Sequence, residues 1–597
     1  MTTDGDPATR RRLPRLTGLA GTVLGLAAAF AAWAKDGTID ARSVRHDADG
    51  PDEVVWATAE NPATRFLSVR FTCARADAIS RAGLRIYRLD DQGLEGFRDH
   101  DASRYAGLDD LEVRALTVPL SDDPRVGPEG SRWRGYRIWL DDQDRLFWSG
   151  RDSVSTKESV VPRFDRLFPP ARNGQGISDH IITIPGWATD AVAIRIDVAT
   201  FRNGDPSNDP KDGRPGGDLA GLAAAIPSLD SLGVTLVLLS SLVTTCPIDP
   251  TAPIDLMSID PRYGNLELFE KVVQQAHSRE MRVVATLPLA AISRSNPWVS
   301  DALYFKEESA FHTFFDFPRT DDGAIANAAD TTGTVPWNAD NPEVVDELLK
   351  PVQLWARTRL DGWYLPDLDS QPPSFWQSLT AAMKALDPKS WIIGQGTGPL
   401  DRWMTGDLVD AIDTPAYEAA VMPFATGKER DAMTLCAALD KRRVETPEPF
   451  TRTSVNPLGA APDDAAGRLA TFLQLTSEGV PLLDASSPLL SGSRRWVREL
   501  IEIRKEHPSL RRGSVEPIYV QGGVACVLRR TSEEMFLVVV NQEPTPLTTR
   551  LPIRGSFGQV SQKDAVDLLS GTRHAIRSGE LFLKDVPAGG MALVRLR

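Results

Sequence analysis

One short segment concentrates oxygen atoms that could hold a metal ion. Four side chains follow the spacing N-x-D-x-x-N-D, and a glycine and an aspartate come shortly after them: Asn203, Asp205, Asn208, Asp209, Gly216 and Asp218. Ca²⁺ takes six to eight oxygen ligands, which a tight loop of this kind could supply. The same composition is also typical of a polar turn built on Asn and Asp side chains, without a metal. From the residues alone we favour the polar turn without a metal.

A second segment places carboxylates after a buried strand. The apolar run from Leu360 to Leu365 predicts a strand, and Asp367 and Asp369 follow it closely. A carboxylate in such a loop can act as a nucleophile or as a general acid or base. The simpler interpretation is that both are solvated or hydrogen-bonded loop groups.

The residues after this strand predict how it is positioned. Apolar side chains recur at helical spacing at Phe375, Leu379, Met383 and Leu386, so we expect a helix that opens at 372–374 and ends before Asp387-Pro388. The run from Trp391 to Gly394 predicts the next strand. Strand, helix and strand in this order form the unit of a parallel α/β sheet.

Residues 361–395, DGWYLPDLDSQPPSFWQSLTAAMKALDPKSWIIGQ, closely resemble the α-amylase family (glycoside hydrolase family 13), in its neopullulanase and cyclomaltodextrinase branch. There the segment reads like DGWRLDVAN…FW…VGE. By this resemblance the family's strand-end arginine falls on Tyr364, its nucleophilic aspartate on Pro366 and its acid/base glutamate on Gln395. A retaining glycosidase needs two carboxyl groups about 5–5.5 Å apart. Proline has no side-chain nucleophile and an amide cannot supply a proton near neutral pH, so we expect a family member without the catalytic pair.

Other motifs extend the resemblance over about residues 185–597. Residues 185–210, PGWATDAVAIRIDVATFRNGDPSNDP, are similar to the family's first barrel strand and the loop after it, where these positions bind a structural calcium. With the resemblance we favour Ca²⁺ for the segment 203–218. The family's sugar-contact positions fall on Thr251, Thr286, Ala291 and Ser454, and the end of its seventh-strand N-H-D motif falls on Val455.

Other residues could have taken over the chemistry. Asp367 or Asp369 could serve as a relocated nucleophile, and Asp413 and Glu418 are candidate acids. Tyr364 could act as a nucleophile, as a tyrosine does in sialidases. Each of these candidates lacks an evident partner in the sequence.

The whole chain predicts an α/β fold, a (β/α)₈ TIM barrel between two β-domains. We expect an N-terminal β-sandwich-like domain at 35–180, the amylase-like barrel at 185–510 with a small excursion at 292–336, and a C-terminal β-sandwich at 511–597. Short apolar runs separated by Asp and Gly turns predict the two β-domains.

Residues 1–34 have the layout of an export signal. Arginines at 10–12 and 15 precede an uncharged stretch at 16–34 that ends in Ala32-Trp33-Ala34. We expect a secreted, periplasmic or cell-surface protein, or one anchored in a membrane by residues 16–34 if they are not removed. The four distant cysteines follow no metal spacing, and one disulfide is an alternative to free thiols if the protein is exported.

The net charge of the chain limits which classes of partner we expect. A net charge of −14 over 597 residues argues against nucleic acid as a partner. The family resemblance implies an α-glucan or oligosaccharide ligand, and the substituted catalytic positions lead us to expect that it is bound but not cleaved. The alternatives are an active hydrolase or transglycosylase with relocated carboxylates, and a membrane-anchored interaction ectodomain whose protein partner the sequence does not name.

Overall fold

The computed structural model describes residues 184–208, 215–246, 249–317, 333–397, 403, 408–413, 415–444, 454–531, 534–552 and 564–596, and the backbone of strands between 54 and 182. The predicted export segment 16–34, Cys73 and Asp209 lie outside the described residues. In the part of the chain that is described, no helix is long and apolar enough to cross a membrane.

Eight parallel strands close into a barrel within the described residues. In spatial order they are β12 (Ala193–Ile196), β13 (Leu236–Leu239), β16 (Arg282–Thr286), β19 (Gly362–Leu365), β20 (Trp391–Gln395), β21 (Ala411–Asp413), β22 (Val455–Pro457) and β23 (Val480–Asp484). The barrel closes because β23 pairs with β12, with Leu482 opposite Ala193. This architecture confirms the predicted fold class.

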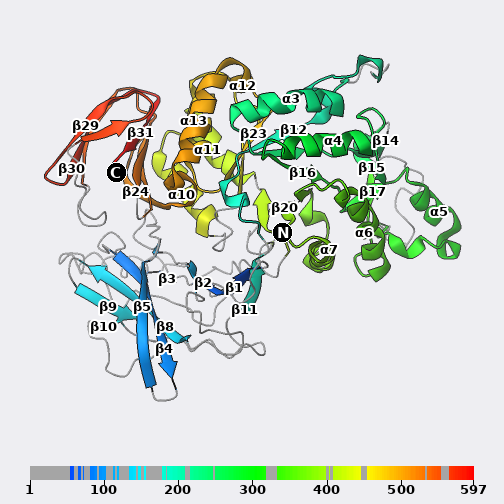
Figure 1. Cartoon of the computed structure of the whole chain (residues 1–597), viewed down its shortest axis with the longest axis horizontal. Helices are drawn as coiled ribbons and strands as arrows, with labels where there is room; N and C mark the ends of the chain where they lie inside the picture. Colours follow the sequence, from blue (N-terminus) through cyan, green and yellow to red (C-terminus); the bar gives the residue numbers. More distant parts are fainter. Residues whose placement is uncertain are drawn as a thin grey trace, which may run out of the picture.

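Helices between the strands and after the last strand cover the barrel (Figure 1). They are α3 (Leu219–Leu232), α4 (Leu266–His277), α6 (Pro342–Ala356), α7 (Pro373–Leu386), α9 (Ala416–Ala425), α10 (Ala432–Val444), α11 (Ala465–Thr476), α12 (Pro488–Gly492) and α13 (Arg494–Glu506). Asp218 caps α3, Asn265 caps α4 and Asp464 caps α11, each accepting a backbone N–H of the first turn. The apolar side of each of these helices then packs on the strands, which explains the helical spacing of buried residues in α7.

Two excursions leave the barrel. The first is the hairpin β14 (Val243–Cys246) and β15 (Asp249–Ile259) after the second barrel strand. The second follows the third barrel strand and contains β17 (Ala291–Ser293), α5 (Pro297–Phe305), η5 (Lys306–Glu308), η6 (His312–Phe314) and β18 (Thr334–Pro336). Helix α5 lies at one end of the long axis of the molecule, and the C-terminal strands lie at the other (Figure 1).

The strands before the barrel form two larger sheets and a short pair. One has the order β11 (Ser178–Ile182), β1 (Val54–Thr58), β2 (Arg65–Ser68), β7 (Thr117–Pro119). The other has the order β10 (Val154–Ser155), β9 (Arg145–Ser149), β8 (Trp133–Asp142), β4 (Arg81–Asp90), β5 (Gly93–Asp101). The pair joins β3 (Phe71–Thr72) to β6 (Glu112–Val113).

The C-terminal strands form an antiparallel sheet. Its order is β24 (Ser514–Gln521), β25 (Val524–Arg530), β26 (Met535–Asn541), β31 (Gly590–Arg595), β28 (Asp564–Asp567), β29 (Arg573–Arg577), β30 (Glu580–Val586) and β27 (Leu547–Pro552). Cys526 on β25 and Leu551 on β27 share one buried core although their strands stand near opposite ends of this order. The sheet therefore folds over its own apolar interior.

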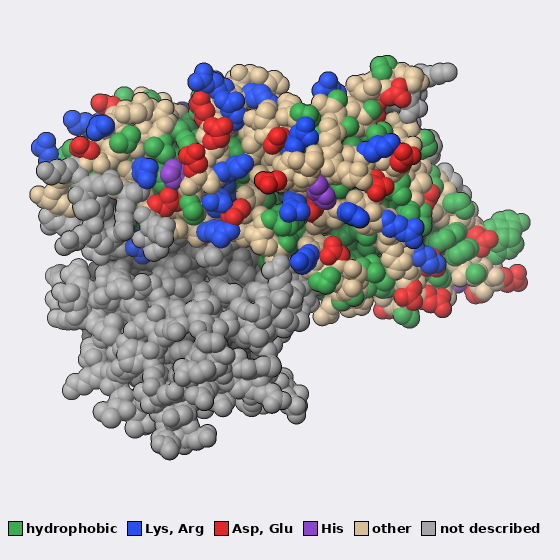
Figure 2. Space-filling view, in the orientation of Figure 1, with side chains coloured by type: hydrophobic (Ala, Val, Ile, Leu, Met, Phe, Trp, Pro, Cys, Tyr) green, Lys and Arg blue, Asp and Glu red, His purple; other side chains and the backbone are tan. Residues whose placement is uncertain are grey.

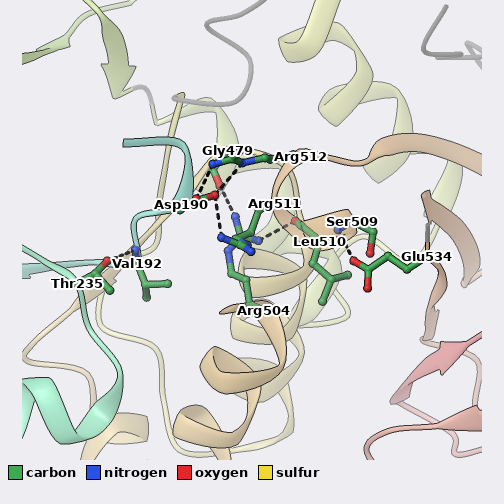
Figure 3. A network of polar contacts seen from close by, with 10 residues as sticks. All are labelled: Asp190, Val192, Thr235, Gly479, Arg504, Ser509, Leu510, Arg511, Arg512 and Glu534. Atoms are coloured by element: carbon green, nitrogen blue, oxygen red, sulfur yellow. Dashed lines mark hydrogen bonds and ion pairs between the residues drawn. The ribbon is translucent and has the colours of Figure 1, made fainter. Parts of the chain in front are cut away.

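The short helix α14 (Pro508–Arg512) joins the barrel to this sheet (Figure 3). Arg511 and Arg512 both pair with Asp190, in the 3₁₀ turn η3 (Ala188–Asp190) before the first barrel strand. Arg504 is buried and donates to the carbonyls of Leu475, Ser477, Gly479 and Leu510. Burial and the nearby guanidinium groups of Arg529 and Arg511 lower the pKa of Arg504 to about 9.

Candidate active site at the carboxyl end of the barrel

Parallel strands of a barrel all end on one face, and that face is where barrel enzymes carry their chemistry. The final residues of four strands are polar here: Thr286, Gln395, Asp413 and Asp484. The strand register places Thr286 opposite Tyr364, and Gln395 opposite Asp413. The structure therefore brings together three positions singled out from the sequence, Thr286, Tyr364 and Gln395. We call this face the barrel mouth.

An ion pair crosses the inside of the mouth. Arg195 reaches from β12 and donates from Nη2 to Oδ2 of Asp413 on β21, at 2.5 Å. The Tyr364 hydroxyl donates to the same oxygen at 2.8 Å. The side chain of Asp413 is only 4% exposed, whereas that of Arg195 is 35% exposed. A buried carboxylate is thus neutralised by a guanidinium that still contacts water.

Tyr364 is poorly suited to act as a nucleophile. Its ring is 5% exposed and lies under the Arg195 guanidinium, 5.7 Å from ring centroid to Cζ. Burial and the neighbouring Asp413 charge raise the pKa of Tyr364 far above its usual value, and the Arg195 charge only partly opposes this. A phenol that stays protonated and already donates its proton to Asp413 does not provide a reactive oxyanion.

The positions that resemble the catalytic pair lie where the resemblance predicts them along the chain, but they carry no carboxyl group. Pro366 directly follows the last residue of β19 and is half-buried. Gln395 is the last residue of β20 and is exposed. Thr286 uses its hydroxyl to donate to the Leu239 carbonyl at 2.6 Å, and Ala291 is the first residue of β17. The mouth therefore offers a proline and an amide where the resemblance predicts carboxylates.

Asp367 and Asp369 have different environments. Asp367 is exposed and has φ 56° and ψ 42°, a left-handed conformation that aspartate tolerates better than most residues. Asp369 accepts from the Thr397 backbone N–H at 2.7 Å and from its hydroxyl at 2.9 Å. Asp369 thus ties the loop after β19 to the loop after β20, as expected for a hydrogen-bonded loop carboxylate.

The two positions singled out for the seventh strand, Ser454 and Val455, are buried, and the strand register places Val455 opposite Asp413. Val455 is the first residue of β22 and is buried with Tyr364 and Ile393 in the barrel interior, and Ser454 precedes it. Residues just past the carboxyl end of this strand include Gly459, where a Cβ would lie 3.1 Å from Oε1 of Glu418. Glu418 therefore places a carboxylate beside this strand end.

Thr251 lies in the hairpin after the second barrel strand. It is exposed and donates from its hydroxyl and its backbone N–H to Oδ1 of Asp249, at 2.6 and 3.1 Å. These hydrogen bonds lower the pKa of Asp249. Thr251 is thus engaged in a local turn.

The loop predicted to hold calcium folds onto the start of α3. Asp218 accepts from the backbone N–H groups of Gly204, Asp205 and Gly221, at 2.9, 2.7 and 2.6 Å. Gly204 is required there, because a Cβ would lie 2.1 Å from the Gly221 nitrogen. The Asp218 carboxylate therefore holds the loop at Gly204 and Asp205 against the first turn of α3.

Two of the other predicted ligands lie on the surface of this loop. Asn203 and Asp205 are exposed, and Oδ1 of Asp205 accepts from Ser207. Gly216 is half-buried, and Asp209 lies outside the described residues. The donor set is made of hard oxygens and suits Ca²⁺ in kind. Within the described residues, no group of three or more His, Cys, Asp or Glu side chains converges to hold a metal ion.

Arg195 is the site residue that sequence reasoning missed. The signal was a lone arginine in the buried segment AVAIRID, two positions after Ala193 and therefore on the same inward-facing side of the strand. Its partner Asp413 was considered only as a candidate acid, because nothing in the sequence shows that strands one and six meet inside the barrel.

A closed (β/α)₈ barrel with polar strand ends defines the class of barrel proteins whose reactions take place at the strand ends. Residues 196–370 match the alpha amylase catalytic domain, and residues 516–595 match the neopullulanase-like C-terminal domain. The chain is a member of the alpha-amylase family, related to neopullulanases and cyclomaltodextrinases.

Individual relatives agree with this assignment. Neopullulanase 2 of Thermoactinomyces vulgaris is 27% identical over 466 residues, covering 69% of this chain and 79% of the relative. A cyclomaltodextrinase of Bacillus sp is 24% identical over 450 residues, covering 65% and 80%. A solved cyclomaltodextrinase structure shares the fold with a TM-score of 0.72 at 20% identity, covering 93% of this chain and 99% of the other.

Proposed function

We propose that this protein binds an α-glucan oligosaccharide at the barrel mouth without cleaving it. The observation that carries the proposal is the side-chain chemistry at the ends of β19 and β20. Pro366 and Gln395 occupy the two positions where the resemblance predicts carboxyl groups. The curated relatives carry the names neopullulanase and cyclomaltodextrinase, which supports an α-glucan as the ligand class.

The mouth residues suit binding better than bond cleavage. The exposed Gln395 amide can donate to and accept from sugar hydroxyls. Arg195 has N–H groups beyond the one that contacts Asp413, and its guanidinium is partly exposed. Asp413 is occupied by Arg195 and Tyr364, so it is a poor candidate for attack on an anomeric carbon.

A second candidate function is glycoside hydrolysis with relocated carboxylates. The specific observation is the left-handed backbone of Asp367, which is exposed beside the end of β19. Strained backbone is more frequent at functional sites than elsewhere. Glu418, beside the end of β22, would be the second carboxyl group.

Product release from starch, pullulan and cyclodextrins separates the two candidates. Purified protein is incubated for long periods, and Asp367→Asn and Glu418→Gln variants are prepared alongside to exclude a contaminating amylase. We expect no product from any of the three proteins. Product from the wild type that both variants lose would establish hydrolysis and refute the binding proposal.

A cyclodextrin-binding measurement tests directly whether the barrel mouth binds a glucan. Calorimetric titration should give a binding isotherm for the wild type and a weaker one for Gln395→Ala. An Asp564→Asn variant, in an exposed position on the C-terminal sheet, is the matched control and should bind like the wild type. If the wild type shows no binding to cyclodextrins or linear maltooligosaccharides, the proposal is wrong.

Export and calcium belong to the same proposal. The arginine-led segment at 1–34 supports an exported protein, either released or anchored through residues 16–34. The oxygen-rich loop that Asp218 folds onto α3 supports a structural Ca²⁺ held by Asn203, Asp205, Asn208, Asp209, Gly216 and Asp218. Such an ion would rigidify the loop that follows the first barrel strand. It would have a structural role and would take no part in catalysis.

A further inference from the structure

Two aromatic rings are exposed together at the end of α5. The Tyr304 side chain is 80% exposed and that of Phe305 is 49% exposed. Their ring centroids are 4.8 Å apart and their planes meet at 80°. Figure 2 shows hydrophobic side chains with acidic ones beside them at the end of the molecule where Figure 1 places α5. We call the pair Tyr304 and Phe305 the α5 platform.

The core of this excursion does not use the α5 platform. Val299 and Ala302 form the buried side of α5. Trp298 stacks on Phe311, with centroids 4.8 Å apart and planes within 6°, and both rings contact Phe314. The local apolar cluster is therefore complete without the exposed pair.

The backbone next to the α5 platform is unusual. Lys306, which ends α5, has φ 52° and ψ −127°, a conformation that a residue with a side chain rarely adopts. Strained conformations of this kind persist where the surrounding structure holds them, and ligand sites are among the places where they gather. Here the conformation ends the helix directly after the two rings.

The residues around the α5 platform are polar and acidic. Glu307 and Glu308 follow in η5 and are exposed. Asp301 lies one turn before Phe305 and accepts from the Ser309 hydroxyl at 2.5 Å. Carboxylates are strong acceptors of hydrogen bonds from hydroxyl groups. An aromatic face bordered by such acceptors suits a neutral ligand that has both C–H faces and hydroxyl groups.

The size of the α5 platform favours a sugar over a protein. At about 200 Å² per ring, the two rings expose on the order of 250 Å², whereas a stable protein interface buries about 800 Å² on each partner. One or two pyranose rings cover an area similar to that of the two exposed aromatic rings. The acidic border also disfavours an anionic membrane surface.

We propose that the α5 platform is a binding site for the sugar rings of an α-glucan chain, separate from the barrel mouth. Tyr304 and Phe305 contact the C–H faces of successive residues, and Glu307 and Glu308 accept from their hydroxyl groups. The α5 platform would give the protein a second point of attachment to the polymer, in addition to the barrel mouth. It rests on the α5 geometry and holds whether or not the mouth cleaves its ligand.

Native gel electrophoresis through amylopectin tests the α5 platform. The full-length wild type should be retarded by the polymer, and Tyr304→Ala/Phe305→Ala should be retarded less. Each ring should contribute about two- to tenfold in affinity. Tyr304→Phe keeps the ring and should behave like the wild type. Met257→Ala removes another exposed apolar side chain, 46% exposed, and is the matched control.

The outcomes separate this site from the mouth. Reduced retardation in the double variant, with retardation retained in Gln395→Ala, supports the α5 platform. Equal retardation of the double variant and the wild type overturns it, and so does a wild type that amylopectin does not retard. Cyclodextrin titration of Gln395→Ala reports on the mouth separately, so the two proposals fail through different measurements.

Discussion

Replacing Arg195 with methionine tests the network inside the barrel mouth. Methionine keeps most of the length of the side chain and removes the positive charge. The structure shows two partners for the Asp413 carboxylate, Arg195 and the Tyr364 hydroxyl. In the variant, Asp413 would remain buried and would keep only the hydrogen bond from Tyr364. A buried carboxylate that loses its ion-pair partner destabilises the folded state, because it is neither solvated nor neutralised.

The magnitude follows from the exposure of the two partners. Breaking a fully buried pair costs about 3–5 kcal/mol. The Arg195 side chain is 35% exposed, so water already screens the pair, and we reduce the expected loss to about 2 kcal/mol. With about 2.1 cal/mol/K of unfolding entropy per residue over roughly 400 residues, this loss lowers Tm by about 2–3 °C.

The assay is a double-mutant cycle followed by urea and thermal unfolding. Asp413→Asn removes the negative charge alone, and Arg195→Met/Asp413→Asn removes both charges. We expect the double variant to be more stable than the sum of the single losses predicts, by about 1 kcal/mol or more. If the two losses simply add, or if Arg195→Met changes the free energy of unfolding by less than about 0.5 kcal/mol, the ion pair does not stabilise the mouth.

Three further predictions concern other parts of the chain. Gly362→Ala should destabilise by about 2–3 kcal/mol, because its Cβ would lie 2.1 Å from the Trp391 carbonyl oxygen, whereas Gly186→Ala, with nothing within 4 Å, should be neutral in the same urea titration. Burial raises the pKa of Glu534, but hydrogen bonds from Ser509 and His507 outweigh it and hold the pKa below its usual value. The stability from Glu534 should therefore be complete above about pH 5 and lost as pH falls through the lowered folded pKa, and Glu534→Gln should flatten the stability curve in that range. Millimolar Ca²⁺ should raise Tm relative to chelator, and Asp205→Ala should abolish the shift; equal Tm values for the wild type in both conditions would refute the calcium proposal.

The parts of the fold that follow local rules were predictable from the sequence. Helical spacing predicted the helix at 372–386, and the structure has α7 at Pro373–Leu386. The apolar run at 360–365 predicted a strand, and the structure has β19 at Gly362–Leu365. Apolar periodicity is a local property of the chain, so it survives into the folded structure.

The interior of the mouth was not predictable in the same way. The contact between Arg195 and Asp413 depends on how strands that are far apart in the chain are arranged around the barrel. The resemblance supplied the positions of Pro366 and Gln395, but not the ion pair that lies beside them.

The pairing of β12 with β23 has a consequence for how the chain folds during synthesis. Ala193 and Leu482 are about 290 residues apart, and at about 5–20 residues per second the ribosome needs roughly 15–60 seconds between them. Until Leu482 emerges, the first barrel strand has one free edge, which could pair with another nascent chain. The ion pairs of Asp190 with Arg511 and Arg512 likewise form only after these two arginines have been synthesised (Figure 3). Folding of the barrel is therefore expected to finish late, and slower translation near the end of the message would prolong the exposure of that edge.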